Sequence, residues 1–233
     1  MFNELLARAS AIIPGQCAVC RAWPSQPLCE ACVARFAQPV PRCQTCALPV
    51  PPGIIRCGAC IRQPPPLDAC HAAVAYAWPW PDCIAAYKFH GNPGWAATLA
   101  TLMRSTPWVE PALERCHVVV PMPLSAQRLR ERGFNQALEL ARRLAPGRTD
   151  ATLLLRISDT PAQARLNRAE RLRNVRGAFA VDPLRRARLS GQDVVLVDDV
   201  MTSGASLHAA AAALRQAGAA RVTALVFART DET

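Results

Sequence analysis

The sequence VVLVDDVMTSGASL occupies residues 194–207, and it decides how the chain is expected to fold. Its first four residues are aliphatic, which is typical of a buried parallel strand, and two acids stand where this strand is expected to end. Small residues at 202–206 then form a turn, and an alanine-rich helix is expected over 204–216. A strand, a small-residue loop and a helix in this order predict an α/β fold with a doubly wound, mostly parallel sheet.

The chemistry of this loop points to a phosphorylated sugar. Unpaired backbone N–H groups and the positive end of the helix dipole meet at a helix N-terminus, where they suit a phosphate group. The hydroxyl groups of Thr202, Ser203 and Ser206 stand beside them. Asp198 and Asp199 would repel an anion, so their expected partners are sugar hydroxyl groups or a hydrated Mg²⁺ ion.

Residues 194–206 resemble the phosphoribosyl pyrophosphate (PRPP) binding motif of type I phosphoribosyltransferases. The resemblance implies that Asp198 and Asp199 bind the ribose 2′ and 3′ hydroxyl groups and act in catalysis, and that residues 202–206 bind the 5′-phosphate. The alternative is a doubly wound sheet in which a strand ends in two acids before a helix cap, with no ligand there. The implied PRPP-binding loop consists of Asp198, Asp199, Val200, Met201, Thr202, Ser203, Gly204, Ala205 and Ser206.

The positive charge of the 233-residue chain is concentrated in its middle. Residues 115–188 contain 16 Arg and six acids, a surplus of ten that equals the net charge of +10. This excess fits an anionic ligand such as PRPP, nucleic acid or both, although arginines on solvated helix faces explain part of it. No apolar stretch is long enough for membrane insertion, and residues 1–15 lack the basic start of a signal peptide, so a cytoplasmic location is expected.

Eight of the 11 cysteines form four Cys-x-x-Cys pairs near the N-terminus. This spacing is typical of tetrahedral zinc, and the Pro-rich stretch around the pairs has few large apolar residues, so metal is expected to hold it together. We therefore expect a double zinc ribbon at residues 13–62 with two structural Zn²⁺ ions, although redox pairs or an iron–sulfur cluster would use similar ligands. The spacing leaves open whether the pairs combine in sequence or crosswise. The expected ligands are Cys17, Cys20, Cys29, Cys32, Cys43, Cys46, Cys57 and Cys60.

A proline-rich linker at residues 61–67 precedes the expected phosphoribosyltransferase-like domain, residues 68–230. Lys88, the only lysine, is a candidate phosphate or pyrophosphate contact, or else a solvated residue at a helix C-terminus. Arg128 and Arg132 share a helical face and are expected to bind pyrophosphate, unless they only face solvent. Segment 158–177 carries five arginines and resembles a basic hood that closes over an active site. Apolar runs predict a helix at 81–90 and strands at 71–78, 116–121, 151–157 and 221–228.

Taken together, these features resemble the ComF family over nearly the full length of the chain. The family implies binding of PRPP or another ribose 5-phosphate ligand with Mg²⁺, in DNA uptake during natural transformation or in the use of external DNA. Its implied partners are single-stranded DNA and proteins of the DNA-uptake machinery. The resemblance is carried by the cysteine pairs, Tyr87–Gly91, Val120–Pro123, Arg128–Gln136, the residues from Gln163 to Asn174, and the PRPP loop.

Whether the chain catalyses transfer stays open at the level of the sequence. In purine-salvage members of the type I group, an Asp stands four residues after the first acid of the motif, but here this residue is Thr202. The departure argues against hypoxanthine or guanine salvage. Two alternatives stand beside the family role: an active phosphoribosyltransferase of nucleotide metabolism with an unknown acceptor, and a non-catalytic accessory protein that binds single-stranded DNA. For transfer, His90 and His117 are the nearest candidate bases, although His117 falls in a predicted strand and is better explained as a core residue.

Overall fold

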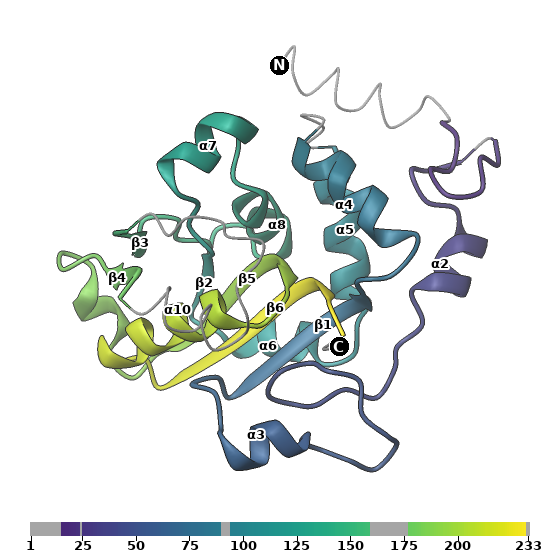
Figure 1. Ribbon diagram of the computed structural model, residues 1–233. Coiled ribbons are helices and arrows are strands. Elements are labelled where there is room, and N and C mark those ends of the chain that lie inside the picture. The colour runs from purple at the N-terminus through teal and green to yellow at the C-terminus, as the bar shows by residue number, and fades with distance from the viewer. Residues whose placement is uncertain (1–14, 24, 90–93, 159–176, 232–233) are drawn as a thin grey trace. The chain divides into compact units, whose positions relative to one another are not determined.

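The computed structural model describes residues 15–23, 25–89, 94–158 and 177–231 (Figure 1). The chain divides into two compact units, residues 1–38 and residues 39–233, and each is described by itself. The first unit holds the described helix α2 (Glu30–Phe36) and a bridge between Gly15 and Ser25. Within the described part of this unit, the buried hydrophobic residues are Cys17, Leu28 and Cys32, so the unit has almost no apolar core.

The second unit is built on a four-stranded parallel sheet with the strand order β1-β6-β5-β2. Val194 and Leu196 of the third strand in this order join one core cluster, and Val195 and Val197 are buried on the opposite face, as the alternation of a strand requires. The predicted α/β fold with a mostly parallel sheet is confirmed. The strands are β1 (Ala69–Ala75), β2 (Val118–Pro121), β5 (Asp193–Met201) and β6 (Arg221–Arg229).

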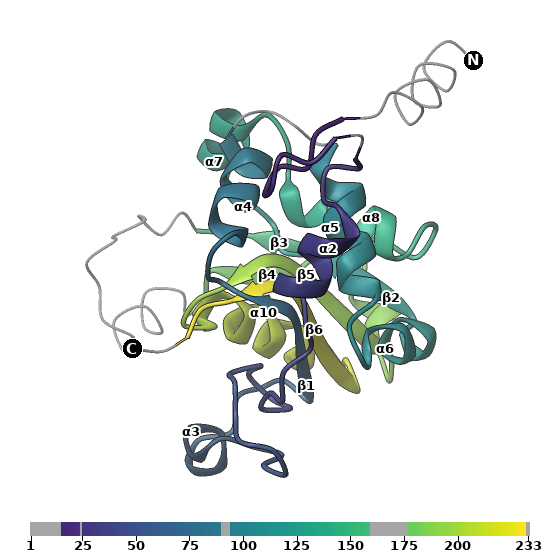
Figure 2. The same cartoon turned by 90° about the vertical axis from the view of Figure 1, so that its right-hand side faces the viewer.

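Helices cover both faces of this sheet, as Figures 1 and 2 show. One face carries α5 (Trp95–Arg104), α6 (Val109–Arg115) and α8 (Gln136–Leu144), and the other carries α10 (Ala205–Gln216). None of the helices within the described ranges is long and apolar enough to cross a lipid bilayer. The other helices within the described residues of this unit are α3 (Gly58–Arg62), α4 (Trp80–Phe89), α7 (Ala126–Arg132) and a 3-10 helix, Arg186–Leu189, that precedes β5.

Two strand predictions differ from the structure. The apolar run at 151–157 forms only β3 (Leu154–Arg156), which pairs antiparallel with β4 (Phe179–Val181) in a separate two-stranded sheet. Leu153 and Leu154 of this run are buried in the core cluster that includes α10, so their apolar character did not require a place in the main sheet. β5 in turn continues past the two acids to Met201, because its last residues pair with the end of β6.

The second group of paired cysteines lies in the second compact unit, and the first group lies in the first unit. Cys43 and Cys46 are buried in the same core cluster as Leu196 of β5 and Ala210 of α10. The segment that contains them therefore packs on the α10 side of the sheet and takes part in the main core.

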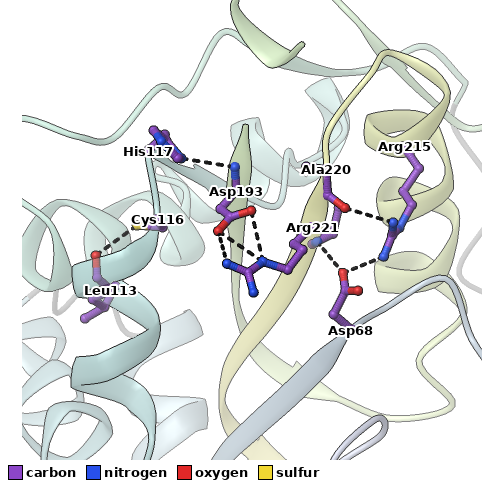
Figure 3. A network of polar contacts seen from close by, with 9 residues as sticks. Asp68, Leu113, Cys116, His117, Asp193, Arg215, Ala220 and Arg221 are labelled. Atoms are coloured by element: carbon purple, nitrogen blue, oxygen red, sulfur yellow. Dashed lines mark hydrogen bonds and ion pairs between the residues drawn. The ribbon is translucent and has the colours of Figure 1, made fainter. Parts of the chain in front are cut away.

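A network of polar contacts closes the amino end of the sheet (Figure 3). Arg221 Nε donates to both carboxylate oxygens of Asp193 at 3.1 Å, and the Asp193 backbone N–H donates to His117 Nδ1 at 3.1 Å. Arg215 of α10 donates to Asp68 Oδ2 at 2.5 Å and thereby joins α10 to the start of β1. His117 lies at the end of the sheet opposite to the loop after β5, so it is too far from that loop to act as a base there. It is also exposed, so the expectation that it is a core residue is wrong.

Candidate functional site

The loop after β5 has the strand, turn and helix order that the sequence predicts. Gly204 is the N-cap residue of α10, and its φ angle of 78° lies in the left-handed region that favours glycine. A Cβ atom at this position would lie 2.9 Å from His208 Nε2 and closer still to Met201 Cε. Three residues of the turn that carry hydroxyl groups are at least partly exposed at this helix N-terminus: Thr202, Ser203 and Ser206.

Asp198 and Asp199 have different environments. Asp199 is buried, and its Oδ2 atom lies 2.9 Å from Lys88 Nζ. The Asp198 side chain accepts a hydrogen bond through Oδ1 from the Asp199 backbone N–H at 2.9 Å. Burial, and then the Asp199 carboxylate, raise the pKa of Asp198 to about 7 against the opposing charges of Lys88 and Arg132. The two carboxylates therefore favour a ligand that brings hydroxyl donors or a cation to them.

Lys88 stands in the last turn of α4 and reaches the acids from a distant part of the chain. Its side chain is 17% exposed and pairs with Asp199, so it is not the solvated lysine that the sequence left as an alternative. The neighbouring Tyr87 fixes α4 in place, because its hydroxyl group donates to Gln136 O at 2.7 Å and its ring packs against Phe134 with 5.6 Å between centroids. Sequence reasoning did not identify Tyr87 or Gln136 as positioning residues.

Of the two arginines that were predicted to bind pyrophosphate, the described contacts place one beside Lys88. Arg132 Nη1 donates to Gln136 Oε1 at 2.9 Å, and its guanidinium group lies over the ring of Phe89, 5.4 Å from the centroid. Arg132 therefore stands beside the end of α4 that carries Lys88. Arg128 is placed in the first turn of α7, where its backbone N–H donates to Ser125 Oγ at 3.2 Å.

A buried arginine that contacts the loop was missed by sequence reasoning. Arg229, the last residue of β6, is 1% exposed and donates through Nη1 to the backbone oxygens of Thr202 and Met201, the latter at 3.2 Å. The signal in the sequence was one charged residue directly after the apolar run at 222–228. Its contacts with the loop are with backbone oxygens, which no residue pattern could indicate.

The eight paired cysteines form two groups of four that combine in sequence order, which settles the pairing left open by the spacing. Within each group, the four sulfur atoms lie within 4.8 Å of one another. Both groups have the same local geometry, because the third cysteine of each donates its backbone N–H to the first sulfur atom. The two contacts are Cys29 N to Cys17 Sγ at 3.4 Å and Cys57 N to Cys43 Sγ at 3.3 Å.

Both cysteine groups fit a zinc ion. Although burial acts in the opposite direction, hydrogen bonds from backbone N–H groups lower the pKa of Cys17 and of Cys43 to about 6, which favours the thiolate form. Burial, together with the neighbouring Cys43, raises the pKa of Cys46 to about 12. Four such sulfur atoms can all become thiolates only when a cation neutralises them, and a closed set of four thiolates is typical of structural Zn²⁺.

A concave region of about 490 Å³ lies at the amino end of the sheet. Its arginines are held by the protein itself: Arg148 Nη1 donates to Leu113 O at 2.7 Å, and Arg185 Nη1 pairs with Asp150 Oδ2 at 3.0 Å. Such local partners account for part of the basic surplus without a ligand. This region therefore does not compete with the loop after β5 as the candidate site.

Some predicted features lie outside the described residues. They include His90 and Gly91 at the end of the predicted motif on α4, and residues 159–176, which make up nearly all of the expected basic hood.

Comparisons with known proteins find relatives over nearly the whole chain. The phosphoribosyl transferase domain family matches residues 130–233. The DNA utilization protein YhgH of Salmonella typhimurium is 31% identical over 232 residues, covering 94% of this chain and 98% of that protein. The competence protein ComFC of Bacillus subtilis is 36% identical over 114 residues, covering 48% of this chain and 45% of that protein. Competence protein F of Haemophilus influenzae is 28% identical over 178 residues, covering 72% and 76%.

Proposed function

Because the chain belongs to the ComF family of phosphoribosyltransferase-like proteins, we propose that it binds PRPP, or another ligand with a ribose 5-phosphate group, at the loop after β5. Binding uses Mg²⁺ and serves DNA uptake or the use of external DNA. The observation that carries the proposal is the meeting of two acids, one lysine and a glycine-containing helix N-terminus at the end of one buried strand.

Each part of the ligand has a suitable partner in this loop. We assign the 5′-phosphate to residues 202–206, which carry hydroxyl groups and no negative charge at the N-terminus of α10. We assign the ribose hydroxyl groups to Asp198 and Asp199, because ionised carboxylates only accept hydrogen bonds and hydroxyl groups donate them. The same carboxylates suit Mg²⁺, which prefers oxygen ligands.

The cations next to the acids suit the pyrophosphate group of PRPP. Lys88 neutralises Asp199, and Arg132 lies beside the end of the same helix. We add Arg128 to this set because it shares the face of α7 with Arg132. If transfer to an acceptor takes place, these side chains stabilise the negative charge that develops on the departing pyrophosphate. Active transfer in nucleotide metabolism is therefore a second candidate function of the same site.

The proposed role of the protein in DNA uptake or use rests on its relatives, which are named for DNA utilization and competence. This part implies single-stranded DNA and proteins of the uptake machinery as partners. It also implies a cytoplasmic protein, since reduced cysteine groups that hold metal are typical of that compartment. The alternative of an accessory protein that binds single-stranded DNA is favoured by the surplus of arginines at residues 115–188.

Calorimetric titration of PRPP into the zinc-loaded protein tests the binding proposal. In the presence of Mg²⁺ we expect saturable binding at one site, and we expect its loss in the double variant Asp198→Asn with Asp199→Asn. Asp193→Asn is the matched control, because it makes the same change at the opposite end of the same strand. Equal affinity in the wild type and the double variant would contradict the assignment of the acids.

Complementation separates the family role from the alternatives. The wild-type gene is introduced into a naturally transformable bacterium that lacks its own relative, and transformation frequency is counted. We expect rescue by the wild type and by Asp193→Asn, and little rescue by the double variant. The double variant could instead rescue transformation fully and still bind single-stranded DNA in a salt-dependent way. That result would support the alternative of an accessory protein that binds single-stranded DNA and does not need the sugar site.

A further inference from the structure

We propose that Arg229 is a positioning residue that joins the loop after β5 to the second four-cysteine group, so that metal binding at Cys43–Cys60 sets the affinity of the loop for a sugar phosphate. This inference rests on the proposed function, because it concerns the same loop. It makes the second cysteine group part of the ligand site, although sequence motifs treat the two as separate modules.

Arg229 contacts both segments at once. Its Nε atom donates to the backbone oxygen of Cys46 at 2.9 Å, and Cys46 is the second cysteine of the second group. Its Nη1 atom donates to the backbone oxygens of Met201 and Thr202, which begin the loop. The same Nη1 atom contacts the backbone oxygen of Thr230 at 2.5 Å. One guanidinium group therefore connects the cysteine turn, the end of β5 and the end of β6.

Further contacts hold the cysteine turn against the sheet. The backbone N–H of Cys70 in β1 donates to Gln44 O at 2.7 Å, and the Cys70 sulfur atom lies 3.6 Å from the Met201 sulfur atom. Arg42 Nη1 donates to Ala47 O at 3.0 Å. The turn at residues 42–47 is thus bonded to β1 at Cys70, and Cys70 in turn contacts Met201 at the end of β5. A displacement of the turn would therefore reach the start of the loop through Cys70 as well as through Arg229.

The chemistry of arginine explains why the connection is stiff. The guanidinium group is planar and its donors have fixed directions, so several carbonyl groups at once determine its position. Because the side chain is 1% exposed, water cannot replace a carbonyl group that moves away. Release of the sulfur atoms from a metal would free the turn that carries Cys46 O. Arg229 would then reorient, and Thr202 O would lose its donor.

The first cysteine group supplies a matched control, because it belongs to the other compact unit. Cys29 and Cys57 occupy equivalent places: each is the N-cap residue of a short helix, and each donates its backbone N–H to the first sulfur atom of its group. The substitutions Cys29→Ser and Cys57→Ser therefore disturb two metal groups of the same design, of which one is joined to the loop through Arg229.

The first test combines metal content with ligand affinity. Bound zinc is counted by native mass spectrometry, and the Kd for PRPP with Mg²⁺ is measured by calorimetry. We expect each variant to lose one zinc ion, and we expect Cys57→Ser to raise the Kd by about 5- to 150-fold, the range of coupling between linked sites, while Cys29→Ser leaves it within about twofold. If either single-serine variant keeps both zinc ions, two double variants replace the single ones: Cys29→Ser with Cys32→Ser, and Cys57→Ser with Cys60→Ser. Equal Kd values for the two variants would overturn the proposal.

A second readout does not depend on PRPP, so it separates a failure of this inference from a failure of the proposed function. Hydrogen–deuterium exchange is followed in peptides that cover residues 200–207 of the zinc-loaded, ligand-free protein. Cys57→Ser is expected to speed exchange there, and Cys29→Ser is not. Arg229→Lys keeps the charge without the planar fork and is expected to speed the same exchange while both zinc ions stay bound. Unchanged exchange in Arg229→Lys and in Cys57→Ser would overturn the coupling even if PRPP binds.

Discussion

The ammonium group of Lys88 lies 2.9 Å from Asp199 Oδ2, and the two side chains are only 17% and 9% exposed. The one lysine of the chain thus neutralises a carboxylate at the end of a buried strand. Without this partner, two adjacent acids at that depth would repel each other and lose hydration. The pair explains how the protein tolerates the acidic residues that its ligand site requires.

Lys88→Met should destabilise the ligand-free protein, because it leaves Asp199 as a buried charge without its cation. We expect a loss of about 3 kcal/mol in the free energy of unfolding, measured by urea denaturation. In a background that already carries Asp199→Asn, the same substitution should cost less than about 1 kcal/mol, since the charge is gone. An equal loss in both backgrounds would show that the lysine acts through packing alone.

Gly204→Ala should damage both stability and ligand binding. The new Cβ atom meets Met201 Cε and His208 Nε2, and the φ angle of 78° is unfavourable for alanine. We expect a loss of about 1–3 kcal/mol in unfolding free energy and the loss of PRPP binding. Gly191→Ala is the matched control: it has a φ angle of 70°, but open space around it, so it should reduce stability and leave the Kd for PRPP unchanged. Equal effects on the Kd would mean that the clash at the loop is irrelevant.

The ion pair in Figure 3 gives a pH dependence of stability with a definite sign. The hydrogen bond from Arg221, and then its charge, hold the pKa of Asp193 below its ordinary value. The pair therefore stabilises the fold at any pH above the ordinary carboxyl range of about 4, and this contribution is lost as pH falls through the lowered pKa. Asp193→Asn should lower the unfolding free energy at pH 7, and its difference from the wild type should shrink as the pH falls below about 4. If the variant and the wild type still differ equally in unfolding free energy in acid, the Arg221–Asp193 ion pair is not the cause of the difference.

Two zinc ions per chain are expected by elemental analysis, one for each cysteine group. Chelation should open the first unit to proteolysis within residues 15–38, because its described buried residues are Cys17, Leu28 and Cys32. The sheet of the second unit has an extensive apolar core and should stay resistant under the same conditions. Resistance of residues 15–38 in the metal-free protein would contradict a structural role for zinc in that unit.

Local sequence patterns predicted the centre of the fold well. The strand, turn and helix at 194–216 are adjacent in the chain, so their periodicity and small residues suffice to identify them. The strand predicted at 151–157 is shorter in the structure, at 154–156, and it lies outside the main sheet, because it pairs in the antiparallel direction with residues 179–181. A buried apolar run of that length looks the same in either sheet.

The sequence predicted those parts of the candidate site that depend on residue type. It did not predict the contacts between residues that are distant in the chain. The acids and the small loop residues follow from the motif itself. The place of Lys88 beside Asp199 depends on how α4 packs, and Arg229 acts on backbone oxygens of Cys46, Met201 and Thr202. No spacing along the chain carries this information.

A crystal structure of the zinc-loaded protein with PRPP and Mg²⁺ tests the central claim most directly. We predict the 5′-phosphate against residues 202–206, the ribose hydroxyl groups at Asp198 and Asp199, and the pyrophosphate group near Lys88 and Arg132. PRPP bound instead in the concave region at the amino end of the sheet, between Arg148 and Arg185, with the loop after β5 empty, would contradict the account.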